Sequence, residues 1–238
     1  MSMPRHPQKG FVLLAMVSAV LIAVAVTLSI RLLDAATAKS GQAADLNGRM
    51  QRIKDALVQF AMLNGRLPCP ANGALVNDPG TAAPSGAVNA CTPNQTAGVV
   101  PWAELGIPRE MSLDPWGRKI TYRVFDGVNS LTRANGVGCV APCTATLLTV
   151  RRTGLPDATD VAFVLVSHGA SGLGAWLPQG GRMSLPVSNV EQANYSAAGP
   201  FNDLTRTDPS VPPTAATHFD DTVHYMTLDA LATAAGRK

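Results

Sequence analysis

The sequence lacks the concentration of positive charge that is typical of nucleic-acid-binding proteins. Its formal net charge is only +3, and no block of Lys and Arg residues contains interleaved aromatic side chains. Binding to nucleic acid depends first on clustered positive charge that neutralises phosphates. The composition therefore excludes nucleic acid as an expected partner.

The sequence also has little that indicates catalysis. The segment Gly169–Leu173 misses the Gly-x-Ser-x-Gly pattern of serine hydrolases by one residue, and Gly172–Gly174 lacks the third glycine of a dinucleotide-binding fingerprint. His168 has no second ligand three or four residues further on, so we expect no metal–histidine site. His218 and His224 add to the number of histidines but complete no zinc-type pattern, and a surface or packing role is expected for His224, which alternates with Tyr225 on an expected strand. We therefore expect that the protein is not an enzyme.

Only four cysteines occur, and they form no Cys-x-x-Cys pair and have no histidines at zinc-finger spacing. If the domain lies outside the cytoplasm, two disulfides are the default expectation. The favoured pairing is local, Cys69 with Cys91 and Cys139 with Cys143. Other pairings stay open, because sequence alone does not determine connectivity.

The first long feature of the chain is a run of twenty uncharged residues from Phe11 to Ile30. As a helix this run would be about 30 Å long, which matches the hydrocarbon core of a bilayer. Three interpretations are open: a signal peptide that is cleaved after Ala38, a plain membrane anchor, or part of a longer helix. The apolar region of a signal peptide is usually ~7–15 residues, which is shorter than this run.

The helical pattern continues beyond the apolar run. No proline occurs between Arg31 and Asn64, and Asn64 with Gly65 provides a stop signal. The pattern therefore predicts one helix of about 50 residues, whose second half is amphipathic. Apolar residues in that half recur at alternating spacings of four and three and form one stripe: Leu46, Met50, Ile53, Leu57 and Phe60.

The rest of the chain predicts short strands and long loops. Ile120, Tyr122 and Val124 alternate with polar residues after a turn at Asp114–Gly117, which is typical of a half-buried strand. A long helix followed by three or four antiparallel strands belongs to the α+β class. The expected strands lie within Leu113–Phe125, Ala145–Thr153 and Asp160–Gly169, of which the last is central; a long loop covers Ala170–His218, and a short strand and a helical turn cover Val223–Leu231.

These motifs, in this order, are similar to those of a known family. A short basic leader that ends at Gly10, followed by Phe11 and an apolar run continuing into an amphipathic helix, resembles the type IV pilins and the type II secretion pseudopilins. The later segments "LDPWGRKITYRV", "FVLVSHGASGLGAW" and "FDDTVHYMTLDAL" also resemble pseudopilins and minor pilins. The resemblance implies a pilin-like fold, in which a long N-terminal helix with a transmembrane first half packs on a small antiparallel sheet with long loops.

The resemblance also implies that the chain is divided into four parts. These are a prepilin leader at 1–10, a transmembrane segment at 11–30, an amphipathic continuation at 31–64 and a periplasmic globular domain at 65–238. A prepilin peptidase would cut between Gly10 and Phe11 and methylate the new amino terminus. The implied location is the bacterial inner membrane, crossed once, with incorporation into a pilus or pseudopilus. The implied partners are other pilin or pseudopilin subunits, the peptidase and the inner-membrane assembly machinery.

The implied function is that of a structural subunit. Members of the family usually carry glutamate as the fifth mature residue, where this chain has Ala15, and the usual proline in the apolar run is also missing. Some minor members lack that glutamate, so we expect a minor subunit. The alternative is a periplasmic binding or enzymatic domain that is held by an ordinary signal anchor.

In major pseudopilins, a Ser-x-Gly loop and a later acidic segment bind calcium. The resemblance therefore implies Ser167, Ser171, Asp220 and Asp221 as calcium ligands, with Ser171 standing where the family usually has Asp or Asn. The alternative is a capped turn, in which Ser167 bonds to local amides and the two aspartates cap the last helical turn or face water. No other cofactor is expected.

Overall fold

The computed structural model describes residues 9–76, 80–81, 91, 97–125, 130–138, 147–196 and 199–237. The expected pair Cys139–Cys143 and most of the expected leader lie outside the described residues. Two compact units divide the chain, Met1–Asp45 and Leu46–Lys238.

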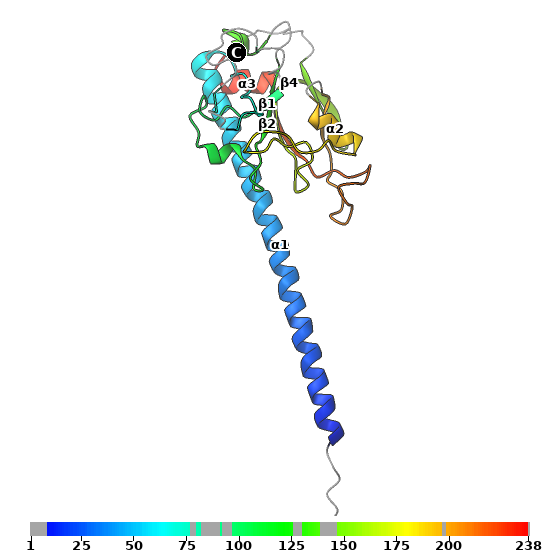
Figure 1. The fold of residues 1–238 in the computed structure, drawn as a ribbon. Coiled ribbons are helices and arrows are strands. Elements are labelled where there is room, and N and C mark those ends of the chain that lie inside the picture. Colours follow the sequence, from blue (N-terminus) through cyan, green and yellow to red (C-terminus); the bar gives the residue numbers. More distant parts are fainter. Residues whose placement is uncertain are drawn as a thin grey trace, which may run out of the picture. The chain divides into compact units, whose positions relative to one another are not determined.

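Helix α1, Lys9–Asn64, confirms the prediction that a single helix continues to Asn64 (Figure 1). It contributes to both units. In the first unit, the large apolar side chains from Met16 to Leu28 are exposed. Within the described residues, no helix is both long enough and apolar enough to span a bilayer.

In the second unit, α1 buries one stripe of apolar side chains. Phe60, which the sequence placed on this stripe, is only half-buried, and the Arg66 guanidinium lies 5.3 Å from the centre of its ring. A step of four residues from Leu57 keeps Ala61 on the buried face instead. The buried stripe, with exposed fractions of 1% or less, consists of Leu46, Met50, Ile53, Leu57 and Ala61.

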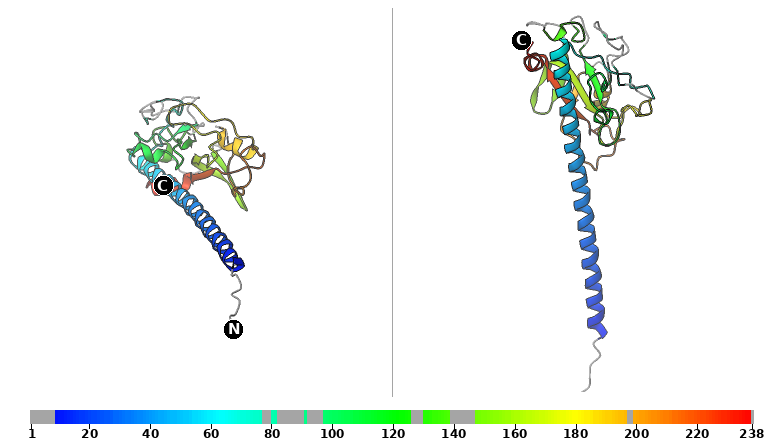
Figure 2. Two further views of the ribbon diagram at one scale, coloured as in Figure 1. Left: turned by 60° about the horizontal axis from the view of Figure 1, so that its bottom comes forward. Right: turned by 90° about the vertical axis from the view of Figure 1, so that its left-hand side faces the viewer.

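A six-stranded sheet forms the other half of the core, and its path runs β1-β2-β4-β3-β5 with β6 also paired to β4. Strand β4 is central, as predicted. β2 and β6 pair with the same residues of β4, so they lie along its opposite edges. Figure 2 shows the last turns of α1, in cyan, beside this sheet. The strands are β1 (Ala97–Val99), β2 (Thr121–Val124), β3 (Leu148–Arg152), β4 (Leu155–Ser167), β5 (Phe201–Asp203) and β6 (Thr222–Thr227).

The α+β class is correct, but the sheet is larger than the three or four antiparallel strands that we expected. β4 begins at Leu155 rather than Asp160, because a turn at residues 153–154 joins it directly to β3. β5 pairs in parallel with β3. The stretch that we expected to be a loop, Ala170–His218, contains both β5 and helix α2, Asn189–Tyr195.

The remaining elements are the short helices η2 (Arg109–Ser112), η3 (Gly136–Gly138) and α3 (Leu228–Ala234).

A disulfide joins Cys69 to Cys91, which is the local pairing that the sequence favoured, with a Cα–Cα distance of 5.6 Å. It connects the chain just after α1 with a point 22 residues further on. Both cysteines belong to the same buried cluster as the stripe of α1. The bond therefore fastens the exit from α1 to the core.

We predict that Leu57→Ala lowers the free energy of unfolding by about 2–5 kcal/mol, because it leaves a cavity between α1 and the sheet. Leu63→Ala is the matched control on the same helix. Leu57 is fully buried, whereas Leu63 is 73% exposed, so the control should change stability by less than about 0.5 kcal/mol. Urea unfolding of the two full-length variants measures the difference. Equal costs would contradict the packing described above.

Candidate functional site

A buried arginine holds the glycine-rich loop that follows β4. The guanidinium of Arg118 donates hydrogen bonds to the carbonyl oxygens of Gly169 and Ala170, with 3.5 Å from Nη1 to the Ala170 oxygen. Arg118 Nε lies 3.4 Å from Oδ2 of Asp114, and both side chains are buried. Removing one member of such a pair would leave an uncompensated buried charge. A fixed positive charge therefore lies against the carbonyls of the loop.

Asp114 also connects the loop to the turn before β2. Its Oδ2 accepts a hydrogen bond from the Ser167 hydroxyl at 3.1 Å. Its Oδ1 accepts from the backbone N–H groups of Trp116 and Arg118, at 3.0 and 2.9 Å. These bonds fix the Asp-Pro-Trp-Gly turn that was visible in the sequence. Ser167 thus fastens the end of β4 to this turn.

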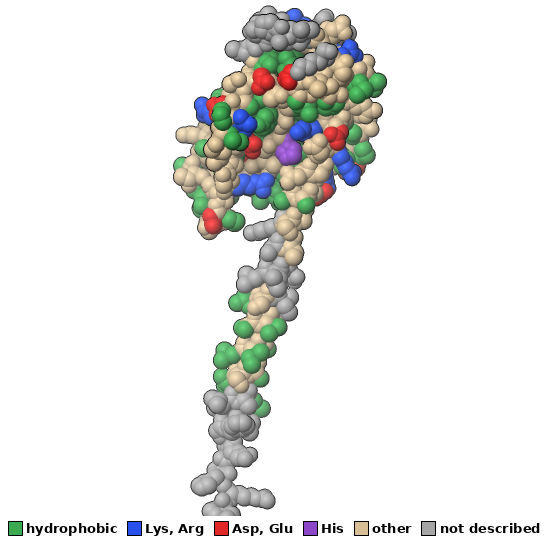
Figure 3. All heavy atoms as spheres, turned by 180° about the vertical axis from the view of Figure 1, so that it is seen from behind, with side chains coloured by type: hydrophobic (Ala, Val, Ile, Leu, Met, Phe, Trp, Pro, Cys, Tyr) green, Lys and Arg blue, Asp and Glu red, His purple; other side chains and the backbone are tan. Residues whose placement is uncertain are grey.

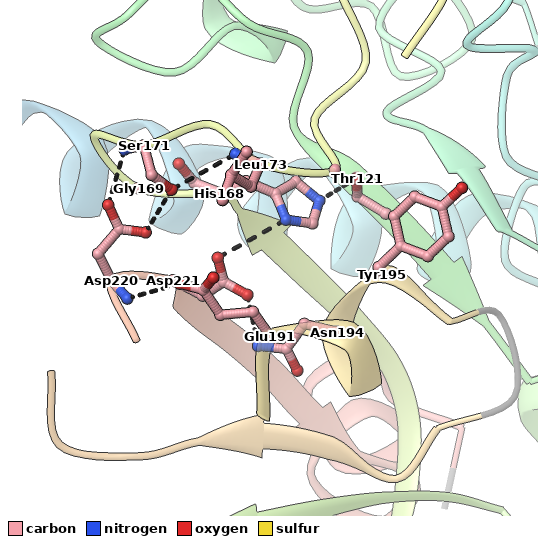
Figure 4. A network of polar contacts seen from close by, with 12 residues as sticks. Thr121, His168, Gly169, Ser171, Leu173, Glu191, Asn194, Tyr195, Asp220 and Asp221 are labelled. Atoms are coloured by element: carbon pink, nitrogen blue, oxygen red, sulfur yellow. Dashed lines mark hydrogen bonds and ion pairs between the residues drawn. The ribbon is translucent and has the colours of Figure 1, made fainter. Parts of the chain in front are cut away.

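Two neighbouring aspartates, Asp220 and Asp221, lie close to the loop but have different partners (Figure 4). Asp220 accepts from the Ser171 backbone N–H at 2.7 Å and from the Ser171 hydroxyl at 3.0 Å. Asp221 accepts from Asn194 Nδ2 at 2.8 Å, and its Oδ1 lies 3.6 Å from Nδ1 of His168. Successive side chains of an extended segment point to opposite sides, which explains the division of partners.

Helix α2 brings a third carboxylate to this cluster. Oε1 of Glu191 accepts from the backbone N–H of Asp220 at 3.0 Å, and Glu191 is 1% exposed. Burial, reinforced by the negative charge of Asp221, raises the pKa of Glu191 to about 8. An anionic Glu191 is therefore unfavourable here unless a positive charge lies beside it.

His218 completes a group of side chains that can hold a metal ion. Its Nε2 lies 3.7 Å from Oε1 of Glu191 and 3.6 Å from Oδ2 of Asp220. The ligand atoms of these three residues all lie within 4.8 Å of one another. From the sequence we expected no metal–histidine site; the structure places these three side chains close together, which does not by itself test that expectation.

Part of this group had a signal in the sequence. His218 and Asp220 are separated by one residue, and in an extended segment such a pair lies on one side of the backbone. Glu191 comes from α2, 29 residues before Asp220, and no spacing pattern connects it to them. No signal in the sequence indicated the contacts of Arg118 with the loop either, because their partners lie 51 and 52 residues further along the chain.

The structure brings together only some of the four residues implied as calcium ligands. Ser171 and Asp220 bond to each other, whereas Ser167 is bonded to Asp114 and Asp221 faces away. Calcium needs six to eight oxygens around one point, including carbonyls, and the loop carbonyls nearby accept from Arg118. The geometry does not favour these four residues as one ligand set. Calcium binding by this chain stays a prediction.

Comparison of the chain with protein-family models, with curated protein sequences and with solved structures finds no match.

We predict that Gly172→Ala destabilises the protein by about 1–3 kcal/mol more than Gly181→Ala. Both glycines have positive φ, at +67° and +78°, so both variants carry similar backbone strain. A Cβ at Gly172 would overlap with Arg118 Nη1, whereas nothing lies within 4 Å of one at Gly181. The guanidinium would have to leave the loop carbonyls. Urea unfolding of the two variants measures the difference.

The same comparison in an Arg118→Ala background is the control for this mechanism. Without the guanidinium, the extra cost at Gly172 should disappear, because the clash that causes it is gone. An extra cost that persists would contradict the role assigned to Arg118.

Proposed function

We propose that this protein is a structural subunit of a type IV pilus or a type II secretion pseudopilus, of the minor kind, and that it has no enzymatic role. A prepilin peptidase cuts it between Gly10 and Phe11. It is then assembled with other pilin or pseudopilin subunits by the inner-membrane machinery, through its apolar N-terminal helix. Its globular part lies in the periplasm. The observation that carries this proposal is the unbroken helix α1 that begins around the Gly10–Phe11 junction.

The exposed apolar side chains of the first unit support the proposal that the protein assembles through helix α1. Large apolar side chains of the described part of this unit are exposed, for example Met16 at 65% and Leu21 at 64%. Figure 3 shows hydrophobic side chains, in green, on the face of this helix that is turned to the viewer. An apolar helix of this kind needs lipid or other apolar helices around it, because exposure of its side chains to water costs roughly 25 cal/mol per Å². The proposal of a membrane segment at Phe11–Ile30 rests on the sequence.

The second unit supports the pilin-like arrangement. The stripe of α1 and the buried residues of β2 and β4 belong to one hydrophobic cluster. A helix packed on a largely antiparallel sheet is the α+β layout that the resemblance implies. The disulfide between Cys69 and Cys91 agrees with an oxidising compartment such as the periplasm.

Ala15 is the basis for proposing a minor subunit. In the family, the glutamate at this position pairs with the amino terminus of a neighbouring subunit. A carboxylate in hydrocarbon is costly unless it is paired, so such a glutamate favours packing against a neighbouring subunit. Because this chain has Ala15 instead, it lacks this reason for repeated stacking of identical subunits. A chain without the glutamate is better suited to a few defined positions than to the body of a filament.

We predict that the mature protein begins at Phe11 with a methylated amino group, as measured by mass spectrometry of the protein purified from its native host. The reason is that the peptidase retains the apolar run, whereas a signal peptidase would remove it. Gly10→Val should abolish this processing. Ala38→Leu is the matched control and should leave the start at Phe11 unchanged.

Two results would overturn the proposal. A mature start at Lys39 that is lost in Ala38→Leu would identify an ordinary signal peptide. An intact Met1 in the presence of an active prepilin peptidase would identify a plain anchor.

A further inference from the structure

The geometry points to a binding site for a divalent transition-metal ion of the zinc class at Glu191, His218 and Asp220. This site goes beyond the proposed function, because it lies wholly in the second unit and does not depend on subunit assembly. It differs from the implied calcium site in using an imidazole nitrogen and the α2 carboxylate.

The first observation concerns the orientation of the histidine ring. Nδ1 of His218 lies 3.0 Å from the carbonyl oxygen of Val211. A carbonyl can only accept, so Nδ1 carries the proton of the neutral ring and Nε2 carries the lone pair. A hydrogen bond of this kind from the second ring nitrogen is the usual support of a metal-binding histidine. The lone pair of Nε2 is therefore available to a metal ion.

The second observation is that two buried side-chain atoms of this group, Nε2 of His218 and Oε2 of Glu191, have no hydrogen-bond partner among the described residues. His218 is 6% exposed and Glu191 is 1% exposed. The nearer carboxylate atoms, Oε1 of Glu191 and Oδ2 of Asp220, each already accept a hydrogen bond from a backbone N–H. Burying such an atom without a partner is unfavourable, and more so when the group is charged. A cation bound at Nε2 would satisfy that atom, and it would satisfy Oε2 as well if Glu191 bound it through both carboxylate oxygens.

The third observation is the spacing of the atoms. Two ligands that share a zinc ion at ~2.1 Å and at tetrahedral angles are roughly 3.4 Å apart. The distances of 3.6 and 3.7 Å from Nε2 to the two carboxylates are close to this value. They are too long for hydrogen bonds, so a proton on Nε2 would satisfy the arrangement less well than a metal ion.

The backbone also positions two of the ligands. Phe219 lies between His218 and Asp220, and its ring is 3% exposed. Its N–H donates to the Thr207 hydroxyl at 3.1 Å, and its carbonyl accepts from the Thr207 N–H at 2.9 Å. With Phe219 anchored in this way, the side chains of His218 and Asp220 lie on the same side and face α2. Three protein ligands leave a further position for water.

The test is titration of the full chain, purified in detergent micelles and stripped of metal with a chelator, with CoCl₂ as the probe. We expect one cobalt ion per chain, detected by its visible absorption, and displacement of cobalt by one equivalent of ZnCl₂. His218→Gln and Glu191→Gln should each weaken binding by more than about tenfold, because each removes a ligand. His224→Gln is the matched control, because His224 lies in the same unit and bonds to Asn47 instead, and it should bind cobalt like the wild type.

The inference is overturned if the wild type binds no cobalt, or if His218→Gln and Glu191→Gln bind it as well as His224→Gln does. Binding of CaCl₂ without binding of cobalt or zinc would also overturn it, because calcium prefers oxygen ligands to an imidazole nitrogen. X-ray absorption spectroscopy of the zinc-loaded wild type tests the ligands even if the variants fail to fold. It should show one imidazole among oxygen ligands and no sulfur, and a second imidazole or a thiolate would contradict the assignment.

Discussion

The packing of one apolar stripe of α1 against the central sheet is the interaction on which the rest of the structure depends. Met50, Ile53 and Leu57 have no exposed surface, and they share a cluster with Tyr122 and Phe163. Each fully buried side chain of this kind contributes about 1.5–3 kcal/mol. The packing fixes the last turns of the helix in the globular unit. The large apolar side chains described in the first unit, from Met16 to Leu28, take no part in this packing and are exposed.

The polar site depends on the same sheet. Strand β4 continues from the buried core directly into Ser167 and the glycine-rich loop, so the core determines where the loop begins. Arg118 then holds the loop by its carbonyls, and Asp220 holds it by Ser171. These contacts give the glycine-rich loop a defined shape. The proposed metal site shares Asp220 with this loop contact and adds His218 and, from α2, Glu191.

The features that follow from local pattern could be predicted from the sequence. The end of α1 at Asn64 and the turn at Asp114 follow from nearby stop and turn signals, and the central position of β4 follows from its being the most hydrophobic of the expected strands. The parallel pairing of β5 with β3 could not be predicted, because it joins segments about fifty residues apart and gives no periodic signal in so short a strand. For the same reason, the contacts of Arg118 and Glu191 with the site became apparent only when the fold brought them to it.

The proposed function requires that the exposed apolar side chains of α1 in the first unit contact the helix of another subunit. A photo-crosslinking amino acid placed at Leu21 in living cells of the native host tests it most directly, with Leu63 as the control. Both side chains are well exposed, at 64% and 73%, but only Leu21 lies in the first unit. The account predicts a covalent adduct between Leu21 and another pilin-like subunit, and none of that kind from Leu63. Adducts from Leu21 with lipid alone, in cells whose pili or secretion machinery are assembled, would contradict it.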